Sequence, residues 1–170
     1  VDSSHSVIAI APGSVWPTKR WPVDAFTQVA KTLIDEHKVV VILGSKDEKI
    51  FGDEIQRRVP EVINLCGTTS SVKLADVSAG CDALVCNDSG SMHMAAVSDT
   101  PIISIFGPTV LELGYQPWSD QFKVIEKKNL KCRPCSLHGG KKCPIGTHEC
   151  MEMIHPDQVI EALGSFIDIN

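Results

Sequence analysis

Short runs of apolar residues alternate along this chain with segments in which apolar positions recur every three or four residues. The short runs predict buried strands at 7–11, 39–43, 61–65, 82–86, 101–106 and 122–125. The helical spacing predicts helices at 22–36, 47–58, 71–79, 91–98 and 156–167. No internal repeat is visible, and the one long irregular stretch is 129–153, which is rich in Cys, Lys, Gly and His.

Strands that alternate with helices indicate an α/β fold, in which a parallel sheet carries helices on both faces. The expected architecture is therefore a Rossmann-like domain. Ligands of such sheets bind beyond the carboxyl ends of the strands, near the point where the strand order reverses. The residues that follow each predicted strand are accordingly the first candidates for a site.

Composition narrows the classes of protein that fit. The 170 residues are 43% hydrophobic and 22% charged, which is typical of one folded domain and not of a disordered chain. The formal net charge of −5 gives no general attraction to nucleic acid, so phosphate binding has to be local. No apolar run reaches the length that spans a bilayer, and residues 1–6 lack the features of a signal peptide.

The first candidate segment follows the strand at 7–11. Gly13 permits close approach of a ligand to the backbone, and Ser14 and Thr18 offer hydroxyl groups. Lys19 and Arg20 supply positive charge just before a predicted helix, whose N-terminus itself favours anions. The segment can hold a diphosphate, although it is neither a Walker loop nor a G-x-G-x-x-G fingerprint. The alternative is a solvated loop with two exposed cations.

The second candidate segment follows the strand at 82–86. Ser89 and Gly90 place backbone N–H groups at a helix start, where a phosphate can bind without a large net charge. Asp88 either caps that helix or binds a sugar hydroxyl. His93 either donates to a phosphate or sugar oxygen or is packed within the fold. The apolar residues of the helix are interpreted as core, namely Met92, Met94, Ala95 and Ala96.

Three motifs together resemble the signature series of glycosyltransferase family 9, which includes the ADP-heptose:lipopolysaccharide heptosyltransferases. They are residues 12–22, 87–96 and 106–109, each placed after a predicted strand. The resemblance covers roughly 7–167, and the run at 18–22 looks closest to the members that add the second heptose. It implies the GT-B architecture, with residues 1–170 as the C-terminal, donor-binding domain. The family's N-terminal acceptor domain is absent from this chain.

The resemblance also implies roles for individual residues. Lys19 would meet the donor phosphates and Asp88 the heptose hydroxyls, and both count as catalytic. Ser89 and Gly90 would donate backbone N–H groups to the diphosphate, supported by His93. Gly13, Ser14 and Thr18 would lie beside the phosphates, and Gly44, Thr68 and Leu74 near the adenosine.

The activity implied by the resemblance is inverting transfer of heptose from ADP-heptose to the lipopolysaccharide inner core, without a catalytic cofactor. The acceptor would be held by the N-terminal domain, and this half alone would bind donor without turnover. No nucleic acid partner and no transmembrane segment are expected. A cytoplasmic location follows, with peripheral contact at the inner membrane face left open.

Four cysteines lie within the irregular stretch 129–153. Cys132, Cys135, Cys143 and Cys150 form the spacing C-x2-C-x7-C-x6-C, which can supply four thiolates to a structural zinc or iron ion. Reduced thiols or one or two disulfides are the alternatives, and His138 or His148 can replace a cysteine as a ligand. The remaining cysteines are interpreted as small core residues, namely Cys66, Cys81 and Cys86.

Two other classes of function stay open at this point. One is a non-catalytic module that binds nucleotide sugars. The other is a metal-binding interaction module in which the cysteine-rich stretch contacts a partner. If Lys19 and Asp88 were dispensable for activity, the enzyme hypothesis would be excluded. Loss of partner binding on metal chelation would favour the interaction module.

Overall fold

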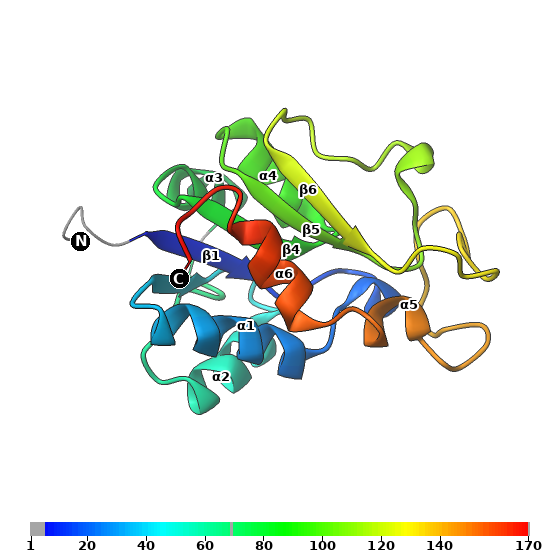
Figure 1. Ribbon diagram of the computed structural model, residues 1–170, viewed down its shortest axis with the longest axis horizontal. Helices are drawn as coiled ribbons and strands as arrows, with labels where there is room; N and C mark the ends of the chain where they lie inside the picture. Colours follow the sequence, from blue (N-terminus) through cyan, green and yellow to red (C-terminus); the bar gives the residue numbers. More distant parts are fainter. Residues whose placement is uncertain (1–5, 69, 170) are drawn as a thin grey trace.

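A computed structural model describes residues 6–68 and 70–169 (Figure 1). Its centre is one six-stranded sheet, in which every strand pair is parallel and the order is β3-β2-β1-β4-β5-β6. The strands are β1 (Val7–Ala11), β2 (Val39–Ile42), β3 (Ile63–Asn64), β4 (Ala83–Asn87), β5 (Ile102–Phe106) and β6 (Phe122–Glu126). The α-helices are α1 (Val23–Asp35), α2 (Lys49–Arg58), α3 (Ser71–Ala79), α4 (Gly90–Val97), α5 (Glu149–Glu152) and α6 (Pro156–Leu163).

Helices cover both faces of the sheet, and alternate side chains of a strand point into two separate hydrophobic cores. In β1, Ile8 and Ile10 face the core that α1, α2, α5 and α6 complete. Ala9 and Ala11 face the opposite core, which α3 and α4 complete. This use of successive side chains on opposite faces explains why the strands read as continuous apolar runs. The predicted Rossmann-like fold is confirmed.

All six predicted strands form, but several bounds differ from the sequence pattern. The strand predicted at 61–65 has only two residues and lies at one edge of the sheet, where Ile63 is 46% exposed. The last helix ends at Leu163 rather than 167. Two 3-10 helices, at Pro17–Lys19 and Leu111–Leu113, and the four-residue α5 were not predicted, since such short elements leave no periodic pattern.

The order of the strands reverses between β1 and β4, which lie side by side with Ala11 opposite Cys86. Their carboxyl ends therefore open onto one crevice, and the two segments singled out by sequence meet there. In the described part of the chain, no helix is long and apolar enough to cross a membrane.

Candidate functional site

The crevice between β1 and β4 holds a buried ion pair. The Lys19 ammonium lies 2.6 Å from Oδ2 of Asp88, and their side chains are only 7% and 3% exposed. Lys19 ends the 3-10 helix after β1, and Asp88 directly follows β4. The structure thus brings together the two residues that the sequence analysis identified as catalytic.

Two further side chains complete the surroundings of this pair. Thr109 Oγ1 donates a 2.6 Å hydrogen bond to the same Oδ2 of Asp88. The Lys19 ammonium lies 4.6 Å from the centroid of the Tyr115 ring, within the range of a cation–π contact. Thr109 lies in a motif that the sequence analysis quoted but gave no role, and Tyr115 was missed because it stands in an irregular segment.

The helix-capping interpretation of Asp88 is wrong. Ser89 occupies the N-cap position of α4, and no side chain caps this helix start. The Asp88 carboxylate instead turns to Lys19 and Thr109. The N–H groups at the start of α4 are therefore available to an anionic ligand.

Asn87, which the sequence analysis passed over, ties the two loops together. Its side-chain oxygen accepts from the backbone N–H of Trp21 at 2.9 Å. Its amide donates to the carbonyls of Pro12 and Gly13 at 2.9 and 3.2 Å. Because Asn87 is fully buried, these bonds fix the position of the Lys19 loop relative to β4. A polar residue at the end of an apolar strand was the available signal.

Two cavities adjoin in the crevice. One, of about 270 Å³, is lined by Ser14, Val15, Trp16, Lys19, Asp88, Ser89, Gly90, His93 and Tyr115. The other, of about 340 Å³, is lined by Ser14, Val15, Gly44, Ser45, Glu48, Ser70, Leu74, Ser89, Gly90, Ser91 and Met94. Ser14, Val15, Ser89 and Gly90 line both, so the two cavities form one groove across β2, β1 and β4.

Several predicted ligand contacts lie outside this groove. The Thr18 hydroxyl is engaged by Gly140 of the cysteine-rich stretch, accepting from its N–H at 2.7 Å. Gly13 lies beneath Glu48, whose carboxylate would collide with any added side chain. Thr68 closes its own turn by donating to the Leu65 carbonyl at 2.8 Å.

Arg20 was expected to add positive charge for a phosphate. The structure uses it to hold the loop instead: its Nε donates to the carbonyl of Ser14 at 2.7 Å. Its guanidinium lies 5.1 Å from the centroid of the Phe51 ring. Lys19 is therefore the cation of this loop that lines the groove.

Two further polar side chains of the groove are Ser89, which the sequence predicted, and Glu48, which it did not. The Ser89 hydroxyl is buried and has no hydrogen-bond partner in the described ranges, although it lies at the junction of the two cavities. Glu48 lines the larger cavity, and its Oε2 accepts from the Ser45 N–H at 2.8 Å. Both groups can bond a polar ligand.

The residues interpreted as core divide into two groups. Met92, Ala95 and Ala96 are buried, but Met94 is partly exposed and lines the larger cavity, so its assignment as core alone is wrong. Cys66 and Cys86 are buried as expected, and burial raises the pKa of the Cys66 thiol to about 12. Cys81 is only partly buried, with its pKa raised to about 11 for the same reason.

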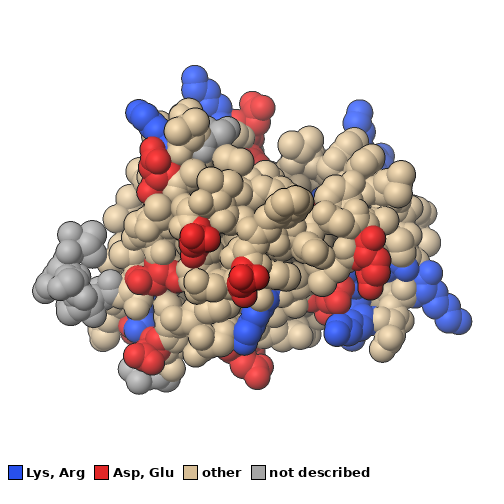
Figure 2. Space-filling model, turned by 90° about the horizontal axis from the view of Figure 1, so that it is seen from above, with Lys and Arg blue, Asp and Glu red and all other residues tan. Residues whose placement is uncertain are grey.

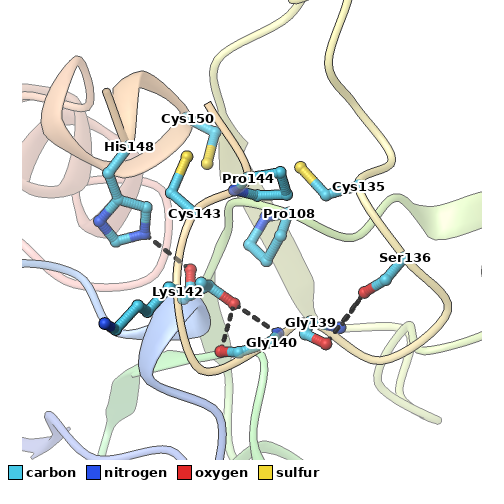
Figure 3. A pocket seen from close by; sticks show the side chains of 11 residues that line it. Pro108, Cys135, Ser136, Gly139, Gly140, Lys142, Cys143, Pro144, His148 and Cys150 are labelled. Carbon is cyan, nitrogen blue, oxygen red and sulfur yellow. Dashed lines mark hydrogen bonds between the residues drawn. The ribbon is translucent and has the colours of Figure 1, made fainter. Parts of the chain in front are cut away.

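The cysteine-rich stretch packs beside the Lys19 loop. Cys135, Cys143, Cys150 and His148 line a small cavity of about 80 Å³ (Figure 3). His148 Nε2 lies 2.8 Å from the carbonyl of Thr18. The loop thus closes one side of the crevice.

The predicted metal ligands are free thiols. Within residues 6–68 and 70–169, no group of three or more Cys, His, Asp or Glu side chains is arranged to hold a metal ion. Backbone N–H groups, that of His148 foremost, hydrogen-bond to the Cys143 sulfur and lower its pKa, whereas burial raises the pKa of Cys150 to about 11. The cysteines gather in one region without forming a closed site.

Charge is distributed without a dominant sign over the face in Figure 2, where Lys and Arg are interspersed with Asp and Glu. In the groove itself, the groups that can attract an anion are Lys19, His93 and the start of α4.

The parallel sheet, its strand order and the crevice at its reversal define a Rossmann-like domain. A family profile, glycosyltransferase family 9 (heptosyltransferase), matches residues 1–144. The chain belongs to this family.

Individual relatives agree. The chain is 33% identical to lipooligosaccharide heptosyltransferase 2 of Campylobacter jejuni over 95% of its own length and 51% of that protein. It is 31% identical to lipopolysaccharide heptosyltransferase 2 of Escherichia coli over 98% and 48%. The solved structure of E. coli ADP-heptose lps heptosyltransferase II superposes with a TM-score of 0.80, at 30% identity, covering 98% of this chain and 47% of that one. The chain therefore spans about half the length of the curated relatives it matches.

Proposed function

We propose that this chain is the donor-binding half of an inverting glycosyltransferase that moves heptose from ADP-heptose to the lipopolysaccharide inner core. The observation that carries the proposal is the buried Lys19–Asp88 pair beside the start of α4. A cation, a fixed carboxylate and free backbone N–H groups meet there at a switch point. The names of the relatives supply the sugar and the acceptor.

The diphosphate fits at the junction of the two cavities. Backbone N–H groups of Ser89 and Gly90 and the buried Ser89 hydroxyl can donate to its oxygens. Lys19 lies on the side of the smaller cavity and can reach the same anion. His93, on the first turn of α4, can donate to a phosphate or sugar oxygen.

Asp88 orients the sugar in this proposal. Its Oδ2 is occupied by Lys19 and Thr109, and among the described residues Oδ1 receives no hydrogen bond. Oδ1 can accept from a heptose hydroxyl in the smaller cavity. The shared contact to Oδ2 fixes the position of the Lys19 ammonium beside the diphosphate.

The adenosine fits in the larger cavity. Leu74 and Met94 offer apolar surface to a base, and Gly44 allows the backbone to approach it. Glu48 can accept from ribose hydroxyls. A nucleoside thus lies across β2, and its diphosphate points toward β4.

The chemical difficulty of the transfer is the charge that grows on the departing ADP. Fixed N–H donors and Lys19 stabilise that charge without having to reorient, and losing one such donor costs about 3 kcal/mol in the barrier. The base that deprotonates the acceptor would come from the acceptor domain. A two-domain enzyme that carries this half should therefore transfer sugar severely more slowly after Lys19→Ala, and remain folded.

The first experiment is calorimetric titration of this 170-residue chain with ADP, with UDP and GDP as controls. Selective binding of ADP that Lys19→Ala abolishes is the expected result. Arg57→Ala, which removes an exposed cation far from the groove, is the matched control and should bind ADP normally. Equal binding of the three nucleotides, or none by a folded chain, would contradict the proposal.

Two finer assignments accompany this function. We propose that the acceptor is held by a partner domain, and that transfer occurs in the cytoplasm with peripheral contact at the inner membrane face. The reason is that the lipopolysaccharide acceptor implied by the family is made at that face.

We also propose that Cys132, Cys135, Cys143 and Cys150 take up a structural zinc or iron ion. Three of these sulfurs line one cavity, and the N–H groups around Cys143 favour its thiolate. The ion would have to draw the free thiols onto a common centre. Elemental analysis of the purified chain tests this: about one equivalent of metal, lost in Cys143→Ser, supports it, and metal-free protein with four reactive thiols contradicts it.

A further inference from the structure

Arg133, which lies between Cys132 and Cys135, reaches out of the cysteine-rich stretch toward the donor groove. Its guanidinium is 5% exposed and pairs with Glu126 of β6 at 2.8 Å. Its Nη1 donates to the Lys127 carbonyl at 2.6 Å, and its Nη2 donates to the carbonyl of Thr109 at 2.8 Å. The last bond fixes the backbone of the residue whose hydroxyl orients Asp88.

The same loop after β5 is held at two more points by the cysteine-rich stretch. The Cys135 N–H donates to the Pro108 carbonyl at 3.0 Å. Met151 of α5 packs so closely on Gly107 that an added Cβ would lie 2.7 Å from its terminal carbon. Residues 107–109 are therefore each held by a contact from the cysteine-rich stretch.

Stability alone does not account for this arrangement. Burying a guanidinium costs free energy of folding, and the pairing with Glu126 offsets that cost only in part. The Nε of Arg133 is buried and has no hydrogen-bond partner in the described part of the chain, which adds a further cost. One branch of the contact network leads from Arg133 through Thr109 to the Asp88–Lys19 pair.

We propose that Arg133 is a positioning residue for sugar-nucleotide binding, which acts on Asp88 and Lys19 through Thr109. The proposal rests on the donor-binding function above, and gives the cysteine-rich stretch a part in it without contact to the ligand. Thr109 transmits the constraint by one backbone bond and one side-chain bond. Removing either should let the Asp88 carboxylate turn and release the Lys19 ammonium.

A double-mutant cycle on this chain tests the route, with the dissociation constant of ADP-heptose measured by calorimetry. Arg133→Gln and Thr109→Val should each weaken binding of ADP-heptose about tenfold. The double variant should bind no more than about twofold more weakly than the single variant of lower affinity, because both substitutions break the same chain of contacts. Thr109→Ser keeps the hydroxyl and should restore most of the affinity. The proposal would be overturned if the affinity losses of the two single variants multiplied in the double variant. It would also be overturned if the affinity of Arg133→Gln stayed within twofold of wild type.

A second readout needs no ligand. The Lys19 ammonium protons, assigned by their loss in Lys19→Arg, should give a protected NMR resonance in wild type and Thr109→Ser. The resonance should vanish in Arg133→Gln and Thr109→Val, since a released ammonium exchanges rapidly with water. A sharp Lys19 resonance in folded Arg133→Gln would overturn the proposal.

The two readouts also separate this proposal from the function it rests on. If wild type binds no ADP-heptose while the ammonium resonance behaves as expected, the donor-binding function fails and the positioning route stands. If Arg133→Gln does not fold, Arg133→Lys replaces it: this variant keeps a charge for Glu126 but lacks the fork that reaches Thr109 at the same time. An unchanged Lys19 resonance in that variant counts against the proposal.

Discussion

The groove between β1 and β4 and the cysteine-rich stretch 129–153 lie side by side but are built differently. At the centre of the groove, Asp88 directly follows β4, Ser89 and Gly90 start α4, and Lys19 ends a short 3-10 helix, so regular backbone positions these residues. The cysteine-rich stretch has four residues of helix and is otherwise held by individual contacts to its neighbours. In the functions proposed above, the first region binds the ligand and the second supports the first.

This difference predicts different effects for substitutions in the two regions. Substitutions in the groove should remove a group that faces the ligand and leave its buried interaction partner unpaired. Substitutions in the cysteine-rich stretch should affect the groove through residues 106–109, or affect only their own surroundings. Three predictions test this division.

The largest effect is expected for Asp88→Ala. This change leaves the Lys19 ammonium buried without its carboxylate, and breaking a buried ion pair costs about 3 kcal/mol of the free energy of unfolding. Urea unfolding followed by circular dichroism measures the loss. Asp35→Ala, which breaks an exposed pair with Lys31, is the control and should not shift the midpoint. A midpoint for Asp88→Ala that matches the control would mean that the groove does not depend on the pair.

A smaller effect is expected at the junction of the two regions. Gly107→Ala forces the buried Met151 to move, and overpacking of this kind costs about 1–2 kcal/mol. Gly80→Ala is the matched control, because the nearest atom to its added Cβ lies at 3.5 Å and its φ of −88° suits alanine. Thermal unfolding of both variants distinguishes them. Equal midpoints would show that α5 does not brace the 106–109 loop.

The smallest effect is one of reactivity, with no change in stability. Backbone N–H groups lower the pKa of Cys143, so its thiolate fraction should rise at lower pH than in an ordinary cysteine. Burial holds Cys66 as a thiol up to a pKa of about 12. In chain stripped of metal by a chelator, alkylation followed by mass spectrometry from pH 6 to 10 should label Cys143 at lower pH than Cys66. The reverse order would show that the N–H groups do not stabilise the thiolate.

The sequence was informative where the structure is regular. Apolar runs and helical spacing predicted the sheet, and the residues after two strands predicted the positions of Lys19 and Asp88 in one crevice. It could not show that Asp88 turns away from the helix it precedes, because that depends on Thr109, twenty-one residues further on. Contacts made by Tyr115 and Arg133 were likewise out of reach, since they depend on how irregular segments fold back.

Among the described residues, the two cavities of the groove have four in common, Ser14, Val15, Ser89 and Gly90. If these four residues bind the diphosphate, the base and the sugar are recognised by separate sets of side chains. Preference for the nucleobase and preference for the sugar can then evolve independently. A change at Leu74 or Met94 would exchange one nucleotide for another and leave sugar choice at Asp88 and His93 intact, which makes this domain a modular starting point for redesigned donor specificity.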